Sequence, residues 1–557
     1  MEIQKFSCTT ILFLFLFAFH GNSQTIHQWE VYSIQFEAQK EMNNPYNELP
    51  VNNNNDLLIV KFKGNSGNAK GKELELTGVW NGGNKWLVNF APPVTGEWEY
   101  TSSSDDPGMD GKSGKIMVYE WSGQELKNNP VRRGLIRVRQ TGENAGHYFE
   151  YTDGTPFLWI ADTWWNWTNE TIRFETWKKL VDDRADKGFT IGQLFVGANG
   201  WSPESSLLDP TFSVLKTDLI QKVERMIEYA NSKGITVWVH GWWSRPQINA
   251  TIGEENMKRW WKYLVHRFAA YNVIWVLAGE YNMHNYGGFD LEFWKDLGRM
   301  IKDEDPYERI VSTHNTPPFW KGGSDGPQWA TGEVLHNEPW LDYNQSQSGH
   351  GKYANEMIPL IVAENYKRKP AKPIVVTEPW YEFVEGNPTG MDVRLAAWGA
   401  VLSGGAGHTY GGGHVWRGSV PESPAGEGGA WPVEVGAELE SFDYEGAVSM
   451  KHLASFFQKI EWWKMAPHPE LVEDYPQPFC LAVPGKEYVI YLRYGGMLNL
   501  KIKGNQEEIF SFYWYNPATG ESTNHESVKG KNYLQFVSPG MYPGALKYSD
   551  WVLHVYR

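Results

Sequence analysis

Short apolar runs that alternate with amphipathic helical stretches are the feature that most restricts the fold of this chain, and they occupy residues 142–460. In one such unit Leu219, Val223 and Ile227 recur at helical spacing, and the run Ile235–His240 follows a Lys-Gly pair. Glycine readily takes the left-handed backbone conformation that ends many helices. Strand and helix patterns that alternate in this way predict a parallel sheet whose strands are connected by helices.

Eight apolar runs in this region have the length of single strands. Eight strand and helix units in about 320 residues predict an α/β fold, a (β/α)8 TIM barrel. The sixth run is the weakest of the eight. In chain order the runs are Phe157–Asp162, Phe189–Val196, Ile235–His240, Val273–Glu280, Ile310–His314, Trp340–Gln345, Ile374–Glu378 and Ala406–Tyr410.

The sequence on either side of the barrel has a different pattern. Residues 25–120 contain short alternating runs separated by Asn, Gly and Pro clusters, which predicts an N-terminal β-sandwich. We expect a linker at 121–140, the barrel at 141–462 and a C-terminal β-sandwich at 463–557. The pattern leaves open whether the C-terminal sandwich binds glycan or only packs against the barrel.

The first 24 residues have the features of a secretory signal peptide. A short segment with Lys5 precedes the apolar run Ile11–Phe19, and small or polar residues follow. The run is too short to cross a bilayer, so we expect no membrane span and export to the periplasm or the medium. Cys8 would leave with the signal, so the remaining Cys480 would have no partner for an intramolecular disulfide.

The composition restricts the partners. The net charge of -15 argues against a nucleic-acid partner, because such a protein needs basic side chains to neutralise phosphates. Aromatic residues make up 15% of the chain and include 29 Trp. This content is typical of surfaces that stack on sugar rings, although a Trp-rich core would also account for it.

Two carboxylates end predicted strands that lie across the barrel mouth. The run NVIWVLAGEYN delivers Glu280 from the fourth strand, and PIVVTEPWYE delivers Glu378 from the seventh. In this fold the carboxyl ends of the strands form the active site. Glycosidic bond cleavage needs two such groups, one to protonate the leaving oxygen and one to attack the anomeric carbon or activate water. Glu338, in an Asn-Glu-Pro sequence, ranks below Glu280 because no strand-like run precedes it.

Other polar and aromatic residues near the predicted strand ends are candidates for substrate binding. Aromatic rings stack on sugars while polar groups bind hydroxyls. Arg245 and Arg417 are suited to a sulfate or uronate, although each has the alternative of a structural ion pair. The substrate-binding candidates are Asp162, Trp165, His240, Trp243, Asn282, His284, His314, Tyr343, Trp380, Tyr381, His408, Trp416 and Arg417.

Three segments of the predicted barrel resemble the apiosidase-like barrel glycoside hydrolases: Gly154–Trp165 (GTPFLWIADTWW), Gly279-Glu280 and Thr377–Glu382 (TEPWYE). The flanks are similar too, since Asn44-Pro45-Tyr46 and Thr95–Tyr100 resemble the sandwich that often precedes such barrels. The C-terminal region resembles a collagen-binding-type sandwich found in that family.

The resemblance implies a retaining glycosidase in which Glu280 is the acid/base and Glu378 the nucleophile. As substrate we expect a plant or algal polysaccharide, or its oligosaccharides, and the two arginines add the hypothesis that this glycan is anionic. The chain departs from the pattern at Gly279, where many retaining barrel enzymes carry Asn, and at Glu280, where apiosidase-type members can carry Asp. Apiose as the sugar is therefore not implied.

Two other functional classes remain open at this point. A metal-dependent barrel hydrolase would use strand-end histidines, but its first strand typically ends in His-x-His, and this chain has Asp162-Thr163-Trp164 there. A non-catalytic glycan-binding protein would keep the aromatic residues without needing both carboxylates. We therefore expect an enzyme without metal or other cofactor, and the oligomeric state is not predicted.

Overall fold

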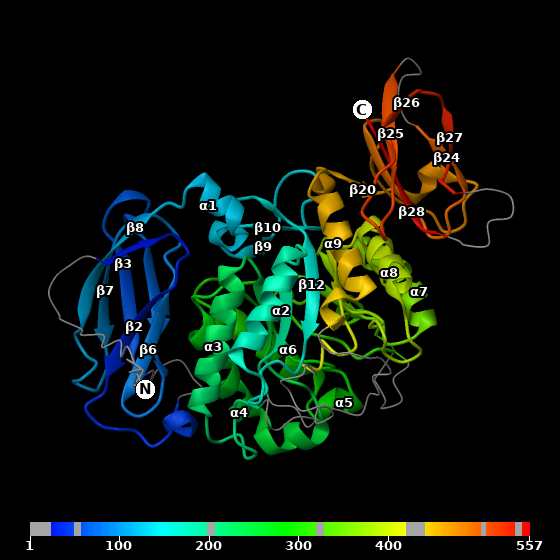
Figure 1. Cartoon of the computed structure of the whole chain (residues 1–557). Helices are drawn as coiled ribbons and strands as arrows, with labels where there is room; N and C mark the ends of the chain where they lie inside the picture. Colours follow the sequence, from blue (N-terminus) through cyan, green and yellow to red (C-terminus); the bar gives the residue numbers. More distant parts are fainter. Residues whose placement is uncertain are drawn as a thin grey trace, which may run out of the picture.

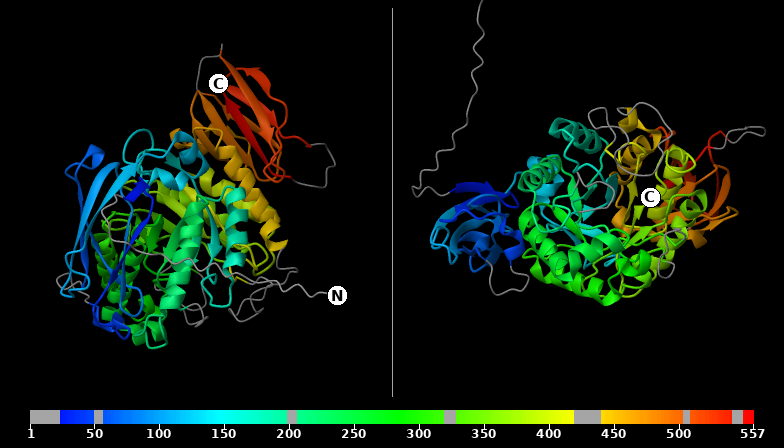
Figure 2. Two further views of the ribbon diagram at one scale, coloured as in Figure 1. Left: turned by 60° about the vertical axis from the view of Figure 1, so that its left-hand side comes forward. Right: turned by 90° about the horizontal axis from the view of Figure 1, so that it is seen from below.

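The computed structural model describes residues 24–49, 57–197, 206–318, 328–418, 440–502, 508–540 and 549–557. The chain forms a central barrel with a β-sandwich on each of two sides (Figures 1 and 2). Nearly all of the predicted signal peptide, including Cys8, lies outside the described residues.

Eight parallel strands form the barrel sheet, and the predicted (β/α)8 fold is confirmed. Neighbouring strands pair in the order β16-β15-β14-β13-β12-β19-β18-β17. Between β16 and β17 the backbone N–H of Asp342 donates to the carbonyl of Val311 at 3.0 Å, which brings the two ends of the sheet together. The strands are β12 Trp159–Trp164, β13 Ile191–Phe195, β14 Thr236–His240, β15 Val273–Val276, β16 Val311–Ser312, β17 Asn344–Gln347, β18 Ile374–Glu378 and β19 Gly407–Tyr410.

Two strands differ from the sequence prediction in a way that affects the site. β15 ends at Val276, so Glu280 lies four residues beyond the strand rather than at its last position. The sixth strand was predicted at Trp340–Gln345 but begins only at Asn344. Apolar content had placed this strand too early, because the true strand is the polar segment NQSQ.

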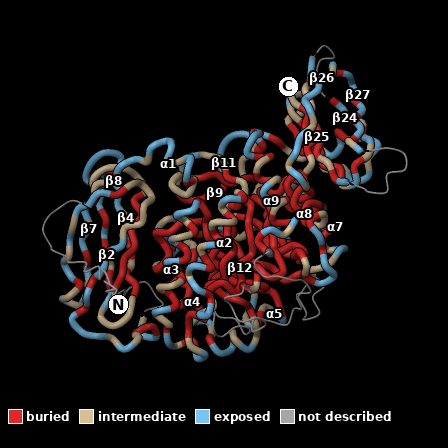
Figure 3. Tube along the Cα trace, viewed as in Figure 1, coloured by how far each residue is buried: buried red, intermediate tan, exposed pale blue. Residues whose placement is uncertain are grey.

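Helices cover the outside of the barrel, and buried residues are concentrated beneath them (Figure 3). The short α5, His284–Gly287, lies on the side of the barrel away from α1, Gly123–Asn128, and from the hairpin of β9, Ile136–Val138, and β10, Phe149–Tyr151 (Figure 1). The outer helices are α2 Phe174–Asp186, α3 Thr217–Ser232, α4 Pro246–Phe268, α6 Leu291–Glu304, α7 Lys352–Tyr366, α8 Gly390–Leu402 and α9 Glu445–Phe457.

A small sheet closes the amino end of the barrel. The stretch predicted as a linker contains α1, Gly123–Asn128, and the first strand of this sheet. The ring of Phe149 lies 5.8 Å from Trp159 and 5.5 Å from Tyr343, both at the starts of barrel strands. We therefore expect the candidate site at the opposite, carboxyl end of the barrel. The sheet consists of β9 Ile136–Val138, β10 Phe149–Tyr151 and β11 Pro156–Phe157.

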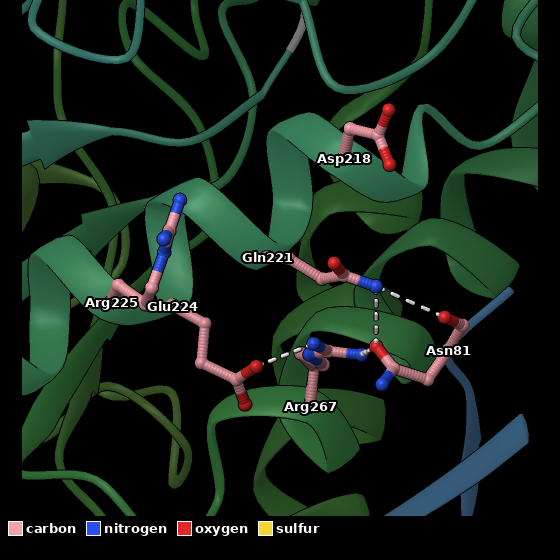
Figure 4. A pocket seen from close by; sticks show the side chains of 6 residues that line it. All are labelled: Asn81, Asp218, Gln221, Glu224, Arg225 and Arg267. Atoms are coloured by element: carbon pink, nitrogen blue, oxygen red, sulfur yellow. Dashed lines mark hydrogen bonds and ion pairs between the residues drawn. The ribbon is translucent and has the colours of Figure 1, made fainter. Parts of the chain in front are cut away.

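The N-terminal sandwich packs against α3 and α4. Asn81 joins the two parts: Nε2 of Gln221 donates to its carbonyl and to its side-chain oxygen, and Arg267 donates to the same oxygen at 2.8 Å (Figure 4). Arg267 also pairs with Glu224. One sheet has the order β1 Gln24–His27, β8 Ser113–Tyr119, β7 Gly96–Ser103, β3 Ile59–Gly64, β4 Glu73–Thr77, and the other β2 Tyr32–Glu37, β6 Lys85–Phe90, β5 Val79–Trp80.

The C-terminal sandwich packs against α8. Asp550 accepts hydrogen bonds from Arg394 at 2.7 Å and from the hydroxyl of Tyr491 at 3.0 Å, and all three are buried. Cys480 is buried in this sandwich as a free thiol. The sheets are β20 Ala466–Pro467, β22 Phe479–Val483, β23 Glu487–Leu492, β28 Trp551–Tyr556, β25 Ile509–Tyr515, β26 Glu526–Lys529, and β21 Val472–Glu473, β24 Met497–Lys501, β27 Tyr533–Val537.

No helix in the described part of the chain has both the length and the apolar character required to span a membrane.

Candidate active site

Glu280 lies beyond β15 and is 6% exposed. Its backbone takes the left-handed conformation, with φ 50°. The indole N–H of Trp243 donates to Oε2 at 3.1 Å, and Nε2 of Gln347 donates to Oε1 at 3.4 Å. Non-glycine residues in this conformation are held by their surroundings and cluster at functional sites. The fold therefore fixes the Glu280 carboxyl rather than leaving it on a loose loop.

The environment of Glu280 favours its protonated form. Burial is the largest cause, the negative charge of Glu378 is the second, and together they raise the pKa of Glu280 to about 8. The hydrogen bonds from Trp243 and Gln347 and the charge of Arg245 oppose this rise without cancelling it. At neutral pH this group holds a proton that it can donate.

Glu378 ends β18 and has the opposite protonation state. Nε2 of His314 donates to Oε2 at 2.9 Å, and Nε2 of His350 donates to Oε1 at 3.1 Å. Burial alone would raise the pKa of Glu378, but the two histidine hydrogen bonds outweigh it and lower the pKa to about 2. Both carboxylate oxygens are thus held, and the group is an anion at neutral pH.

Aromatic rings connect the two carboxyl groups. The ring of Trp165 lies 5.8 Å from Trp243, which binds Glu280, and 6.3 Å from His314, which binds Glu378. The indole N–H of Trp165 donates to the hydroxyl of Tyr381 at 3.0 Å. The pKa of the Tyr381 phenol is raised, first by burial and second by the negative charge of Glu378. Glu280 and Glu378 therefore belong to one cluster.

His240 lies within this aromatic cluster. It is fully buried at the end of β14, and neither ring nitrogen has a hydrogen-bond partner within the described residues. Burial, followed by the nearby His314, lowers its pKa well below the usual value. His240 is a neutral imidazole that packs between the rings of Trp165 and Trp243.

Asp162 and His408, predicted to bind substrate, are not in the cluster. Asp162 is completely buried, accepts a hydrogen bond from Nε of Arg184 at 2.6 Å and another from Trp164 at 2.9 Å. Arg184 belongs to α2, so Asp162 faces the helix layer. Tyr410 also makes its hydrogen bond in the helix layer. His408 lies two positions before Tyr410 in β19, and side chains two apart in a strand share a face, so His408 faces the helices too. Position at a strand end does not determine which face a side chain takes.

Tyr343 lies outside the cluster, just before the start of β17, whereas His284 lies on the same side of the barrel as the strand ends but is exposed. Because β17 starts at Asn344, Tyr343 precedes the strand, and its hydroxyl accepts a hydrogen bond from Trp238 at 2.9 Å inside the barrel, with Phe149 beside it. His284 begins α5 and is exposed.

The remaining candidates lie in the loops that follow β15, β18 and β19. Asn282 accepts a hydrogen bond from the backbone of Thr316 at 2.8 Å and so joins two loops. The indole N–H of Trp380 donates to carbonyls of its own loop. Trp416 lies 6.2 Å from Tyr381, and the guanidinium of Arg417 lies 5.6 Å from the Trp416 ring.

A family model, apiosidase-like catalytic domain, matches residues 143–464, more than half of the 557-residue chain. The chain belongs to the apiosidase-like family. Residues 25–105 match a domain of unknown function, DUF5060, and residues 472–556 match a family named for a collagen-binding domain of a collagenase. No curated protein matches the sequence significantly.

Solved structures with the same fold support the architecture of this apiosidase-like chain. A glycoside hydrolase family 5 protein from Bacteroides vulgatus is 20% identical with a TM-score of 0.64, over 77% of this chain and 94% of that one. A candidate glycoside hydrolase from the same species is 17% identical with a TM-score of 0.68, over 96% of this chain and all of that one. At these identities the likeness shows the fold, while the family match makes the chain a glycoside hydrolase, as predicted.

Two residues of the apiosidase-like site were not predicted from the sequence. Gln347, which binds Glu280, ends a strand that hydropathy did not reveal. His350, which binds Glu378, stands just before α7. The signal that could have found both is their place at the carboxyl end of β17, in Gln347, and just beyond it, in His350, because β17 lies between the strands of Glu280 and Glu378 in the sheet order.

Two further observations concern the alternatives. Glu338 forms an ion pair with Arg299 at 3.1 Å, and its carbonyl accepts a hydrogen bond from Lys372, which precedes β18. It therefore lies toward the amino end of the barrel, away from Glu280. Among the described residues, no group of three or more His, Cys, Asp or Glu side chains is arranged to hold a metal ion.

Proposed function

We propose that this glycoside hydrolase retains the anomeric configuration, with Glu378 as nucleophile and Glu280 as acid/base. The observation that carries the proposal is the opposite shift of two carboxyl groups in one buried cluster, with pKa values of about 2 and about 8. Glycosidic cleavage by either stereochemical course needs one anionic and one protonated carboxyl at neutral pH, and the sequence resemblance implies the double displacement.

In the first step an oxygen of Glu378 attacks the anomeric carbon while the bond to the leaving oxygen breaks. Glu280 transfers its proton to that oxygen, so the departing group leaves as a neutral hydroxyl. Glu280, now an anion, then removes a proton from a water molecule that attacks the anomeric carbon. The ester to Glu378 breaks, and both carboxyl groups return to their starting states.

The surrounding residues serve this reaction by position and charge. His314 and His350 hold both oxygens of Glu378, which fixes the direction of attack. The indole of Trp165, between the two carboxyl groups, offers an apolar face on which a sugar ring stacks.

For substrate, we propose a plant or algal polysaccharide or its oligosaccharides, with an anionic group such as a uronate or sulfate. Arg245 supports this, because the interaction of its charge with Glu280 places a cation near the reacting carboxyl. Arg417, half-buried over Trp416, places a second positive charge beside Tyr381. Guanidinium groups bind such anions through paired hydrogen bonds. We further propose that the first 24 residues direct export.

The experiment has two stages. Purified protein is first incubated with 4-nitrophenyl glycosides of neutral sugars and uronic acids in both anomeric forms, and with neutral, uronate-rich and sulfated polysaccharides. Proton NMR then follows the anomer formed first from whichever substrate is cleaved. Product of retained configuration supports the proposal, whereas inverted product would make Glu378 a base for water. Turnover confined to neutral glycans would contradict the anionic substrate.

A further inference from the structure

A third buried glutamate, Glu382, lies four residues after Glu378 and is completely inaccessible to solvent. The hydroxyl of Tyr410 donates to its Oε2 at 2.7 Å, and the backbone N–H of Gly446 donates to both oxygens at 3.0 Å. Burial raises the pKa of this carboxyl to about 7. A buried carboxyl is costly, so one that has no part in the reaction requires another explanation.

The site around Glu382 is shaped to receive its carboxyl. A Cβ on Gly446 would lie 2.5 Å from Oε2 of Glu382 and 2.7 Å from the Tyr410 ring, so only glycine lets the N-terminal turn of α9 approach this closely. Arg184 from α2 and Glu445 from α9 are the charged groups that act on it. The absence of a side chain at Gly446 is therefore what makes room for the carboxyl of Glu382.

The backbone of Glu382 joins the loops that follow β18 and β19. Its N–H donates to the carbonyl of Gly411 and its carbonyl accepts from the N–H of Gly413, both at 2.9 Å. With the side-chain bond to Gly446, this one residue connects both loops to α9. The next residue back is Tyr381, and its ring packs on Gly411, where a Cβ would lie 2.2 Å from the ring.

Tyr381 connects this junction to the reacting carboxylate. Its hydroxyl accepts the Trp165 hydrogen bond, and its ring lies 4.6 Å from His350, which binds Glu378. We propose that Glu382 is a positioning residue that fixes Tyr381, and through it His350 and the Glu378 nucleophile, by fastening the loops after β18 and β19 to the start of α9. The inference rests on the proposed function, because it concerns the geometry of that nucleophile.

The test compares Glu382→Gln with Asp550→Asn. The two replacements are matched: each removes the charge of a buried carboxyl that accepts a tyrosine hydrogen bond, but Asp550 joins the barrel to the C-terminal sandwich. With the 4-nitrophenyl glycoside that wild type cleaves, we expect Glu382→Gln to lower kcat about tenfold or more and to leave KM within about twofold. Asp550→Asn should lower the melting temperature without changing kcat of the folded enzyme.

Hydrogen–deuterium exchange supplies a readout that needs no substrate. Glu382→Gln should speed exchange in residues 379–388 and 411–418, and Asp550→Asn should not. If Glu382→Gln fails to fold, Tyr410→Phe and Gly446→Ala, which disturb the same carboxyl from its two partners, should show both effects. Unchanged exchange and kcat would overturn the inference. Full activity in Glu378→Gln would instead overturn the proposed function, while the exchange result would still decide the role of Glu382.

Discussion

The imidazole of His240 lies directly against the backbone of Gly279: a Cβ built on that glycine would be 2.5 Å from Nε2 of His240 and 2.4 Å from its Cε1. The same Cβ would meet the ring of Trp243 at 2.6 Å. Where many retaining barrel enzymes carry Asn, this chain therefore has no room for any side chain, because His240 and Trp243 occupy it. The residue before Glu280 is glycine for a steric reason.

Gly279→Ala is expected to displace His240 and Trp243, and with Trp243 the hydrogen bond to Glu280. A shift of about 1 Å at a reacting group costs on the order of 100-fold in rate, so kcat/KM should fall by about that factor. Steady-state kinetics measures this. Gly123→Ala, at a position where a Cβ meets nothing within 4 Å, is the control and should behave as wild type. Equal activity in both variants would contradict the packing described here.

Opposite effects on stability are expected from Glu280→Gln and Glu378→Gln. The folded-state pKa of Glu280, about 8, exceeds its ordinary 4.5, so wild type loses stability as pH rises from 4.5 to 8. Glu280→Gln escapes this loss and should be more stable than wild type at pH 8, by at most about 5 kcal/mol, with no gain below pH 4.5. Thermal unfolding at several pH values measures the difference.

Glu378 gives the contrasting case, because its pKa is lowered to about 2. Its ionised form contributes stability above pH 4.5 that is lost as pH falls toward 2. Glu378→Gln should therefore be less stable than wild type between pH 5 and 8. The same sign for both variants at pH 8 would contradict the assigned protonation states.

His350→Asn is expected to change the acid side of the pH–rate profile. Losing the 3.1 Å hydrogen bond removes one of the two contacts that lower the pKa of Glu378, so that pKa should rise. A hydrogen bond to a charged group is worth about 1.5–3 kcal/mol, which corresponds to a rise of about 1–2 pH units in the acid limb of kcat/KM. His336→Asn is the control, since His336 binds Asn344 and the carbonyl of Pro370 at the amino end. A limb that moves equally in both variants would refute the role of His350.

Asp162→Asn should destabilise the protein without impairing catalysis. The replacement removes the fully buried ionic partner of Arg184 and leaves that guanidinium paired with Asp183 alone, so we expect a loss of at most about 3–5 kcal/mol. We expect a lower melting temperature and unchanged KM and kcat for the folded enzyme. A raised KM with normal stability would restore the substrate-binding role predicted from the sequence.

The predicted strand at Ile374–Glu378 matched the structure residue for residue because β-branched apolar residues are bounded there by a proline on each side, Pro373 and Pro379. The strand NQSQ was only partly predicted because its polar side chains find hydrogen-bond partners where they are buried: Gln345 donates to the hydroxyl of Tyr343 inside the barrel, and Asn344 bonds His336. A hydropathy pattern reveals a buried strand only when the strand itself is made of apolar residues. The error moved Tyr343 into the site and left Gln347 out.

The aromatic content predicted only in part which aromatic residues lie in the site and which lie in the core. Trp165, Trp243 and Tyr381 lie in the cluster as the aromatic content suggested, whereas Trp159 and Trp238 fill the barrel interior. Distinguishing them requires the depth of each residue along its strand. That depth depends on strand register, which the long-range packing of eight strands determines and a local pattern does not.

Covalent trapping tests the central claim most directly. The 2-deoxy-2-fluoro form of the cleaved glycoside, with an activated leaving group, slows hydrolysis of a glycosyl-enzyme, and peptide mass spectrometry then locates the label. The account predicts a single glycosyl group on Glu378, formed in wild type and absent in Glu378→Gln. A label on another residue, or inverted product with no adduct, would contradict the assignment of Glu378 as nucleophile.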